Sequence, residues 1–145
     1  AGDLALAAGA KRVVPLNVSG AWHSALMDPA RDEFARHVMD AAVMLPRFTV
    51  ISNVDAKPYG DVEQIKTNLI RSVTDEVLWH DAAVALASYE LDLVVEFGAS
   101  AVLAPMFKRI PNAPKAITVS DAAGVEKLRA QLAHAPASQR ELVEG

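Results

Sequence analysis

The sequence predicts an α/β fold with a largely parallel sheet. Strand-like segments alternate with helix-like segments along most of the chain, which is the pattern of a parallel sheet connected by helices. Residues 91–97 form a nearly continuous apolar run, typical of a strand buried on both faces of such a sheet. The chain has 145 residues, of which 52% are hydrophobic, so it can bury a sizeable core.

The N-terminal segment predicts the end of a helix and then a strand. Residues 1–10 look like the last turns of a helix that ends at Gly9, the usual residue at a helix C-terminus. A domain that begins inside a helix has been cut, so we expect further chain before residue 1. The valine-rich residues 12–18 predict a strand, with Pro15 near an edge or a bend.

A helix and a short strand are predicted next. Asp28 followed by Pro29 predicts a helix start, with the aspartate as the N-cap and the proline in the first helical position. We expect this helix to end at Pro46. Residues 48–52 are rich in β-branched side chains and predict a short strand, which leads into a loop at residues 53–58.

The second half of the chain alternates between helix and strand. Asp61 is the predicted N-cap of a helix whose apolar residues recur every three or four positions. The remaining predicted elements are a helix at residues 82–89, the strand at 91–97, a helix at 101–109, a strand at 115–120 and a helix at 121–133. Residues 134–145 are polar and predict a flexible tail.

Composition narrows the possible functions. The net charge of −4 gives no support to nucleic-acid binding, and the absence of cysteine excludes disulfides and thiolate chemistry. We expect no membrane partner, because no apolar run approaches the roughly 18 residues that span a bilayer. The N-terminus lacks the pattern of a signal peptide, so a cytoplasmic protein is expected.

The most informative segment is VSGAWHSALM at residues 18–27, which places His23 between a predicted strand and a predicted helix. Ligands of parallel sheets bind at the carboxyl ends of the strands, and this junction suits such a position. A neutral imidazole can take a proton from a serine hydroxyl near pH 7 if a third group orients the ring. The alternative is that His23 only caps the helix that begins near Asp28.

Partners for His23 are scarce in the sequence. The chain has no Gly-x-Ser-x-Gly motif, which would expose a nucleophilic serine at a strand-to-helix turn. The nearest approach, at residues 97–101, lacks the second glycine, and a simple turn with Ser100 as a helix cap explains it better. No metal site is expected, because His37, His80 and His134 have no second ligand at metal-binding spacing.

Several ordered motifs resemble the C-terminal portion of the malonyl-CoA:acyl carrier protein transacylase family. They are AGAKR at residues 8–12, VSGAWHSALM at 18–27, ISNVDAKP at 51–58, VLW at 77–79, and VEFG at 95–98 leading into KRI at 108–110. The resemblance implies that residues 1–18 end a ferredoxin-like small subdomain and that residues 19–133 are the C-terminal part of an α/β-hydrolase-like acyltransferase core, followed by the tail at 134–145.

The resemblance also implies an activity. A serine activated by the family's histidine, here His23, would attack the malonyl thioester, and the phosphopantetheine thiol of acyl carrier protein would then take the malonyl group. A main-chain carbonyl near Ser72 would orient His23. No cofactor is implied, since malonyl-CoA and the carrier protein are substrates.

Three further residues take roles by resemblance. Trp22 would narrow the substrate pocket against an α-methyl branch, which favours malonyl over methylmalonyl; the alternative is that it only packs under the histidine loop. Lys11 and Arg12 match a region that resembles the family's face for docking the carrier protein. The alternative for these two residues is ordinary solvated surface.

Departures from the family pattern leave the function open. The family's Gly-His-Ser-x-Gly elbow, its carboxylate-binding arginine and its oxyanion-hole glutamine have no counterpart, so we expect the chain to need the N-terminal half of the enzyme as a partner and to be inactive alone. One alternative is a non-catalytic module that docks acyl carrier protein or a synthase. Another is a fragment of a polyketide-synthase acyltransferase domain that uses a different extender unit.

Overall fold

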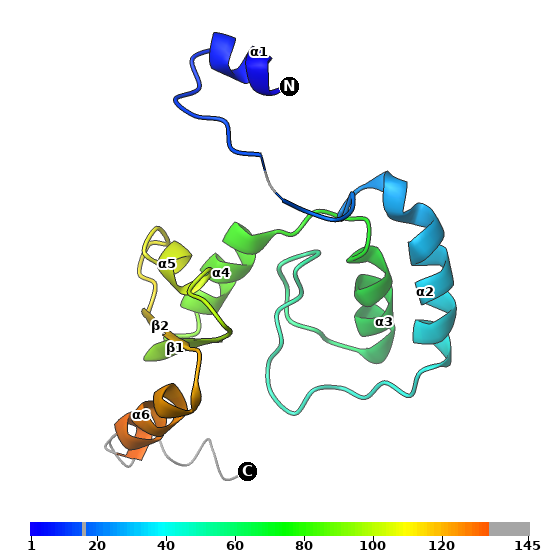
Figure 1. Cartoon of the computed structure of the whole chain (residues 1–145). Coiled ribbons are helices and arrows are strands. Elements are labelled where there is room, and N and C mark those ends of the chain that lie inside the picture. The colour runs from blue at the N-terminus through cyan, green and yellow to red at the C-terminus, as the bar shows by residue number, and fades with distance from the viewer. Residues whose placement is uncertain (16, 134–145) are drawn as a thin grey trace.

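The computed structural model describes residues 1–15 and 17–133 of the chain. Its elements in chain order are α1 (Gly2–Ala7), the short 3₁₀ helix η1 (Ala25–Met27), α2 (Asp28–Asp40), α3 (Val62–Arg71), α4 (Trp79–Ala87), β1 (Leu93–Phe97), α5 (Ala104–Phe107), β2 (Lys115–Val119) and α6 (Ala122–Ala133). Figure 1 shows α2 packed beside α3, and α4 and α5 gathered around the two strands. The architecture is therefore a mixture of helices and parallel strands, as predicted.

Helix α1 ends where the sequence predicts. The N–H of Ala10 donates to the carbonyl of Ala5 at 3.0 Å, and the N–H of Gly9 donates to that of Leu6 at 3.0 Å. Gly9 has a φ of 94°, a left-handed conformation that only glycine adopts at little cost. This pair of hydrogen bonds is the Schellman arrangement, and it confirms Gly9 as the helix-terminating residue.

The strand predicted at residues 12–18 is wrong for the positions that the structure describes there. These residues are assigned to no strand, and Val14 and Val18 are 56% and 65% exposed. Strand formation requires a neighbouring strand to complete its ladder of hydrogen bonds, and no described segment pairs with this one. Pro15 also lacks the N–H that a ladder position needs.

Helix α2 begins as predicted, but another residue caps it. Ser24 accepts a hydrogen bond from the N–H of Leu26 and starts the single turn η1, which continues directly into α2. Asp28 is already helical, with φ −49° and ψ −45°, and its carboxylate pairs with Arg31 at 2.7 Å. Asp28 is therefore not the N-cap: Met27 takes that position without a side-chain hydrogen bond, and Ser24 caps the preceding turn η1.

Helix α3 begins as predicted, with Asp61 as its N-cap. The carboxylate of Asp61 accepts from the N–H of Gln64 at 2.7 Å, and the Gln64 side chain accepts from the N–H of Gly60 at 2.8 Å. The Nζ atom of Lys66 donates to the carbonyl of Met39 at 2.7 Å. That bond satisfies a carbonyl in the last turn of α2 and ties the end of α2 to α3.

The second predicted strand, at residues 48–52, is also absent. The structure has a single antiparallel bridge between Ile51 and Pro58 in its place. Residues 48–52 do carry β-branched side chains, but only the two ends of the following loop, at Ile51 and Pro58, pair with each other. A hairpin of this length closes the loop without building a sheet.

The two strands and their helices form the apolar core. Strands β1 and β2 pair in parallel, with Val95 opposite Ile117. Ala83 of α4 and Phe107 of α5 are buried here together with Ile110, and the ring of Trp79 meets that of Phe107 edge-on at 5.6 Å. The prediction that the strand at residues 91–97 is buried on both faces is wrong, because residues 93–96 are only partly buried and Phe97 is exposed.

Two of the later elements differ from prediction in length or burial, and a third is confirmed. Phe97 is 69% exposed, although it pairs with Val119 of β2. Helix α5 spans four residues rather than the predicted nine, since the chain bends at residues 102–103 before it and turns at residues 108–109 after it. Helix α6 is confirmed, and the Asp121 carboxylate accepts from the N–H of Gly124 at 2.7 Å. The predicted tail at 134–145 lies outside the described residues.

Candidate active site

The backbone of His23 has an unusual conformation. Its φ of 58° lies in the left-handed region, where residues other than glycine are uncommon and where histidine is enriched among the exceptions. Such a conformation costs on the order of 1–3 kcal/mol and persists only where the surroundings hold it. The His23 N–H donates to the carbonyl of Val73 at 3.2 Å, so the turn after α3 is one of the groups that hold it.

The imidazole is held by the same turn. Its Nδ1 atom lies 2.9 Å from the carbonyl oxygen of Asp75. A carbonyl oxygen can only accept, so Nδ1 is the donor, and in the neutral imidazole this leaves the lone pair on Nε2. The side chain is exposed. In its neutral form the ring can therefore accept a proton at Nε2.

The carbonyl that binds His23 belongs to Asp75, and the prediction of Ser72 is corrected. Ser72 is the C-cap of α3: its N–H donates to the carbonyl of Asn68 at 2.9 Å and its hydroxyl donates to that of Leu69 at 2.6 Å. Ser72 thus still belongs to the last turn of the helix. The chain needs three more residues to turn and reach the imidazole.

The Asp75 side chain is tied to α3. Its carboxylate binds Arg71 through Nε and through NH2, at 2.8 Å each. The Thr74 hydroxyl donates to the other carboxylate oxygen at 3.2 Å. The N–H of Asp75 donates to the carbonyl of Arg71 at 2.8 Å, so Arg71 holds both the backbone and the side chain of the residue that binds His23.

The other predicted site residues are exposed. Trp22 is 57% exposed, and its indole lies over Gly20: a Cβ added there would sit 3.3 Å from the indole Nε1. Lys11 and Arg12 are exposed on the loop that leads from α1. The structure therefore brings His23 together with the turn at Asp75, and it places the two basic residues on a separate segment.

A buried polar cluster anchors the loop at residues 53–58 to α3, and sequence reasoning missed it. Asn68 is 3% exposed, and its Nδ2 donates to Ser52 Oγ at 3.0 Å and to Asp55 Oδ2 at 3.0 Å. The only signal in the sequence is a polar residue on the apolar face of the helix. Because α3 ends in the turn that holds His23, this cluster connects the loop to the candidate site.

Hydrogen bonds in this cluster outweigh burial at Asp55. Burial raises the pKa of its carboxyl, but the donors around it lower the pKa further, so that it lies below its usual value. Those donors, in order of effect, are Asn68, Ser52, the N–H of Lys57 and Gln64. The carboxylate is therefore kept charged by the residues that fix the loop.

Glu96 at the end of β1 takes the capping role that the sequence assigned to Ser100. Its carboxylate accepts from the N–H groups of Leu103 at 2.8 Å and Ala104 at 2.9 Å, and from the Thr118 hydroxyl at 3.2 Å. The hydrogen bond from Leu103, followed by that from Ala104, lowers the pKa of Glu96. Ser100 is exposed and precedes α5. The start of α5 is thus held to the sheet by Glu96.

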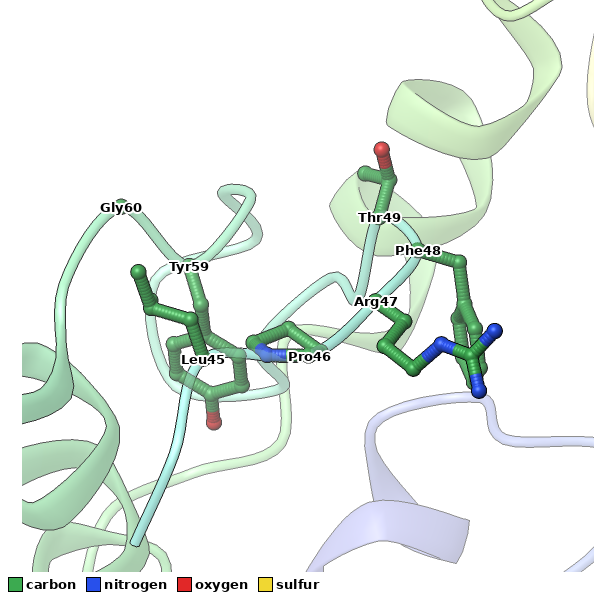
Figure 2. Close-up of a pocket in the computed structure, with 7 residues that line it drawn as sticks. All are labelled: Leu45, Pro46, Arg47, Phe48, Thr49, Tyr59 and Gly60. Atoms are coloured by element: carbon green, nitrogen blue, oxygen red, sulfur yellow. The ribbon is translucent and has the colours of Figure 1, made fainter. Parts of the chain in front are cut away.

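A shallow pocket lies away from these residues. It has a volume of about 350 Å³ and is lined by Leu45, Pro46, Arg47, Phe48, Thr49, Tyr59 and Gly60. Figure 2 shows Arg47 and Phe48 on one side of it, and Leu45 and Tyr59 on the other. None of the predicted site residues lines this pocket.

Two negative findings apply to residues 1–15 and 17–133. No group of three or more histidine or acidic side chains there could hold a metal ion. No helix in the same residues is long and apolar enough to cross a membrane.

Known proteins resemble this chain along most of its length, although it matches no protein-family model. It is 35% identical over 116 residues to the malonyl CoA-acyl carrier protein transacylase of Haemophilus influenzae, which covers 80% of this chain and 37% of that protein. FabD from Acinetobacter baumannii matches in three dimensions with a TM-score of 0.83 and 32% identity, over 92% of this chain and 43% of FabD.

A further solved structure is a malonyl-transacylase in complex with a type II PKS acyl-carrier protein. It matches with a TM-score of 0.80 and 36% identity, over 87% of this chain and 41% of that one. The chain belongs to the malonyl-CoA:acyl carrier protein transacylase family. It spans about two fifths of the length of these transacylases.

Proposed function

We propose that this chain is the histidine-bearing part of a malonyl-CoA:acyl carrier protein transacylase and that His23 is its general base. The observation that carries the proposal is the hydrogen bond from His23 Nδ1 to the carbonyl of Asp75. It fixes the tautomer that leaves Nε2 free to take a proton, and it lies in the motif that resembles the family's catalytic histidine segment.

The proposed reaction has two half-reactions. His23 Nε2 takes the proton of a serine hydroxyl as the serine oxygen attacks the thioester carbon of malonyl-CoA. The C–S bond breaks, and the departing CoA sulfur takes the proton from Nε2. The thiol of the carrier protein then gives its proton to Nε2 as its sulfur attacks the carbonyl carbon of the malonyl-serine ester. The ester C–O bond breaks, and the departing serine oxygen takes the proton back from Nε2.

The nucleophilic serine would come from the part of the family fold that this chain does not span. In that arrangement residues 1–18 end a ferredoxin-like subdomain, and residues 19–133 belong to an α/β-hydrolase-like core. The parallel pairing of β1 with β2 and the three-dimensional match to solved transacylases support this assignment. The exposed imidazole of His23 is compatible with a second segment that packs against it.

Substrate and partner follow from the same proposal. Trp22, the neighbour of His23, would limit the space beside the thioester and favour malonyl over branched acyl groups. Lys11 and Arg12 would attract the carrier protein by charge, an effect that weakens as salt is added. Their exposure on one loop supports this role.

A chimera tests the proposed function. The chain replaces the matching segment of the Haemophilus influenzae transacylase, and malonyl transfer to holo acyl carrier protein is followed by intact mass. His23→Ala in the chimera should abolish transfer, whereas His37→Ala, a change in the last turn of α2, should leave it intact. A cooperatively folding chimera that transfers malonate equally well with and without His23 would overturn the proposal.

A second candidate is a non-catalytic docking module, favoured by the absence of a Gly-x-Ser-x-Gly motif from the sequence. Affinity of the chain for acyl carrier protein that survives His23→Ala, together with a folded chimera that never transfers malonate, would support it. A polyketide-synthase acyltransferase with another extender unit would instead be recognised by transfer of a branched acyl group in the same assay.

A further inference from the structure

Both hydrogen bonds that orient His23 end on one short turn. Its backbone N–H donates to the carbonyl of Val73, and its Nδ1–H donates to the carbonyl of Asp75. The direction of the Asp75 carbonyl depends on the rotation of a single peptide plane. Whatever fixes that plane also fixes the tautomer and the direction of the imidazole.

Arg71 contacts this turn through both its backbone and its side chain. Its carbonyl accepts from the N–H of Thr74 at 3.1 Å and from that of Asp75 at 2.8 Å. Its guanidinium grips one carboxylate oxygen of Asp75 through Nε and NH2, at 2.8 Å each. Rotation of the Asp75 peptide would have to pull this carboxylate away from the guanidinium.

We propose that Arg71 is a positioning residue for His23 and that it acts through Asp75. The importance of this role for catalysis rests on the proposed function, whereas its effect on the imidazole can be measured without any activity. The imidazole binds the carbonyl of Asp75, whereas the carboxylate of the same residue binds Arg71 and so anchors it.

The ion pair between Arg71 and Asp75 is too exposed to contribute much to the stability of the fold, so stability does not explain its presence. The side chains of Arg71 and Asp75 are 47% and 33% exposed, and ion pairs of this kind contribute little to folding free energy. A positioning role therefore predicts that loss of Arg71 alters the tautomer of the His23 imidazole and has little effect on the stability of the chain.

Nitrogen NMR of the full chain tests the proposal. The ¹⁵N shifts of His23 Nδ1 and Nε2 are measured in the neutral imidazole, with His23→Ala to assign the signals. The unsubstituted chain should show a hydrogen on Nδ1. Arg71→Met should shift both signals toward the tautomer mixture of an unconstrained histidine, and Arg71→Lys, which keeps the charge, should retain part of the original tautomer.

Arg129→Met is the matched control, because it removes an ion pair with Glu126 on α6, a helix outside the candidate site. It should leave the His23 signals unchanged. If Arg71→Met unfolds the chain, Asp75→Asn tests the same link, because it keeps the carbonyl and weakens the grip of Arg71. A folded variant of Arg71 or Asp75 with the tautomer of the unsubstituted chain would overturn the proposal.

The chimera separates this proposal from the proposed function. Arg71→Met should lower kcat by about tenfold, a modest part of what a general base contributes, and should leave KM for malonyl-CoA within about twofold. If the tautomer shifts but the parent chimera has no activity, the positioning role stands and the proposed function fails. If the tautomer shifts and kcat does not change, the fixed tautomer has no part in transfer, and Arg71 has no positioning role in the reaction.

Discussion

The Nδ1 atom of His23 lies 2.9 Å from the carbonyl oxygen of Asp75, a residue 52 positions further along the chain. In Ser-His-Asp enzymes a carboxylate occupies the equivalent place and stabilises the imidazolium that forms during the reaction. A neutral carbonyl fixes the tautomer equally well but contributes less to the stability of that cation. The proposed base is therefore positioned more by geometry than by charge.

The left-handed backbone of His23 predicts a difference between two inactive variants. Glycine adopts a φ of 58° without the clash of a Cβ, whereas alanine does not. His23→Gly should therefore be more stable than His23→Ala by about 1 kcal/mol, although both lack the imidazole. Urea unfolding of the two variants measures the difference. Equal stability would mean that the conformation at this position carries no strain.

Trp22 predicts the selectivity of the proposed enzyme. Trp22→Ser should raise the ratio of methylmalonyl to malonyl transfer in the chimera, because the smaller side chain leaves room for an α-methyl group. One methyl group in a pocket is worth about tenfold or more in discrimination. Competition between the two CoA thioesters measures the ratio. Unchanged selectivity would mean that Trp22 only covers Gly20.

The buried amide of Asn68 predicts a large cost on removal. Asn68→Ala takes away donors to Ser52 and Asp55, and it should lower the free energy of unfolding by about 2 kcal/mol. Thr67→Ala, at the exposed neighbouring position of α3, should change it by less than about 0.5 kcal/mol. Chemical denaturation of both variants gives the comparison. Similar values would show that the cluster does not anchor the loop.

The hydrogen bonds that Glu96 accepts predict that the start of α5 is held less firmly at acidic pH. Its folded pKa lies below the ordinary value of 4.5, so its contribution to stability is complete above pH 4.5 and is lost as the pH falls through the folded pKa. The amide signals of Leu103 and Ala104 should titrate with a midpoint below pH 4.5.

A pair of variants isolates this effect. Glu96→Gln should abolish the titration of the Leu103 and Ala104 amides, because no carboxylate remains to bind them. Glu126→Gln on α6 removes an exposed carboxylate and should leave the titration as it was. A midpoint at or above pH 4.5 in the unsubstituted chain would contradict the assigned role of Glu96.

Local signals explain which elements the sequence predicted well. Asp61 and Gly9 act through hydrogen bonds to residues three to five positions away, so their patterns are complete within a short stretch of chain. The segments at 12–18 and 48–52 have the side chains of strands, but a strand also needs a partner, which no local pattern specifies. Both strand predictions failed for that reason.

The candidate site could be predicted only in part. The imidazole of His23 and the small residues around it identified the position of the site. The family resemblance implied that a main-chain carbonyl binds the ring. The identity of that acceptor depends on how the chain turns after α3, and neither Ser72 nor Asp75 has a side chain that reveals it. Asn68 and Glu96 were missed because a polar residue in an apolar pattern does not say whether it finds buried partners.

Because the acceptor at Asp75 is a backbone carbonyl, substitutions affect it differently from a side-chain acceptor, both in evolution and in the laboratory. The genetic code specifies side chains, and every residue carries a carbonyl, so no substitution at position 75 can delete the group that binds His23. Selection at this position acts on the path of the backbone, which in our proposal the Asp75 carboxylate helps to fix through Arg71. An ester in place of the peptide bond between Asp75 and Glu76 would weaken the acceptor while leaving every side chain in place.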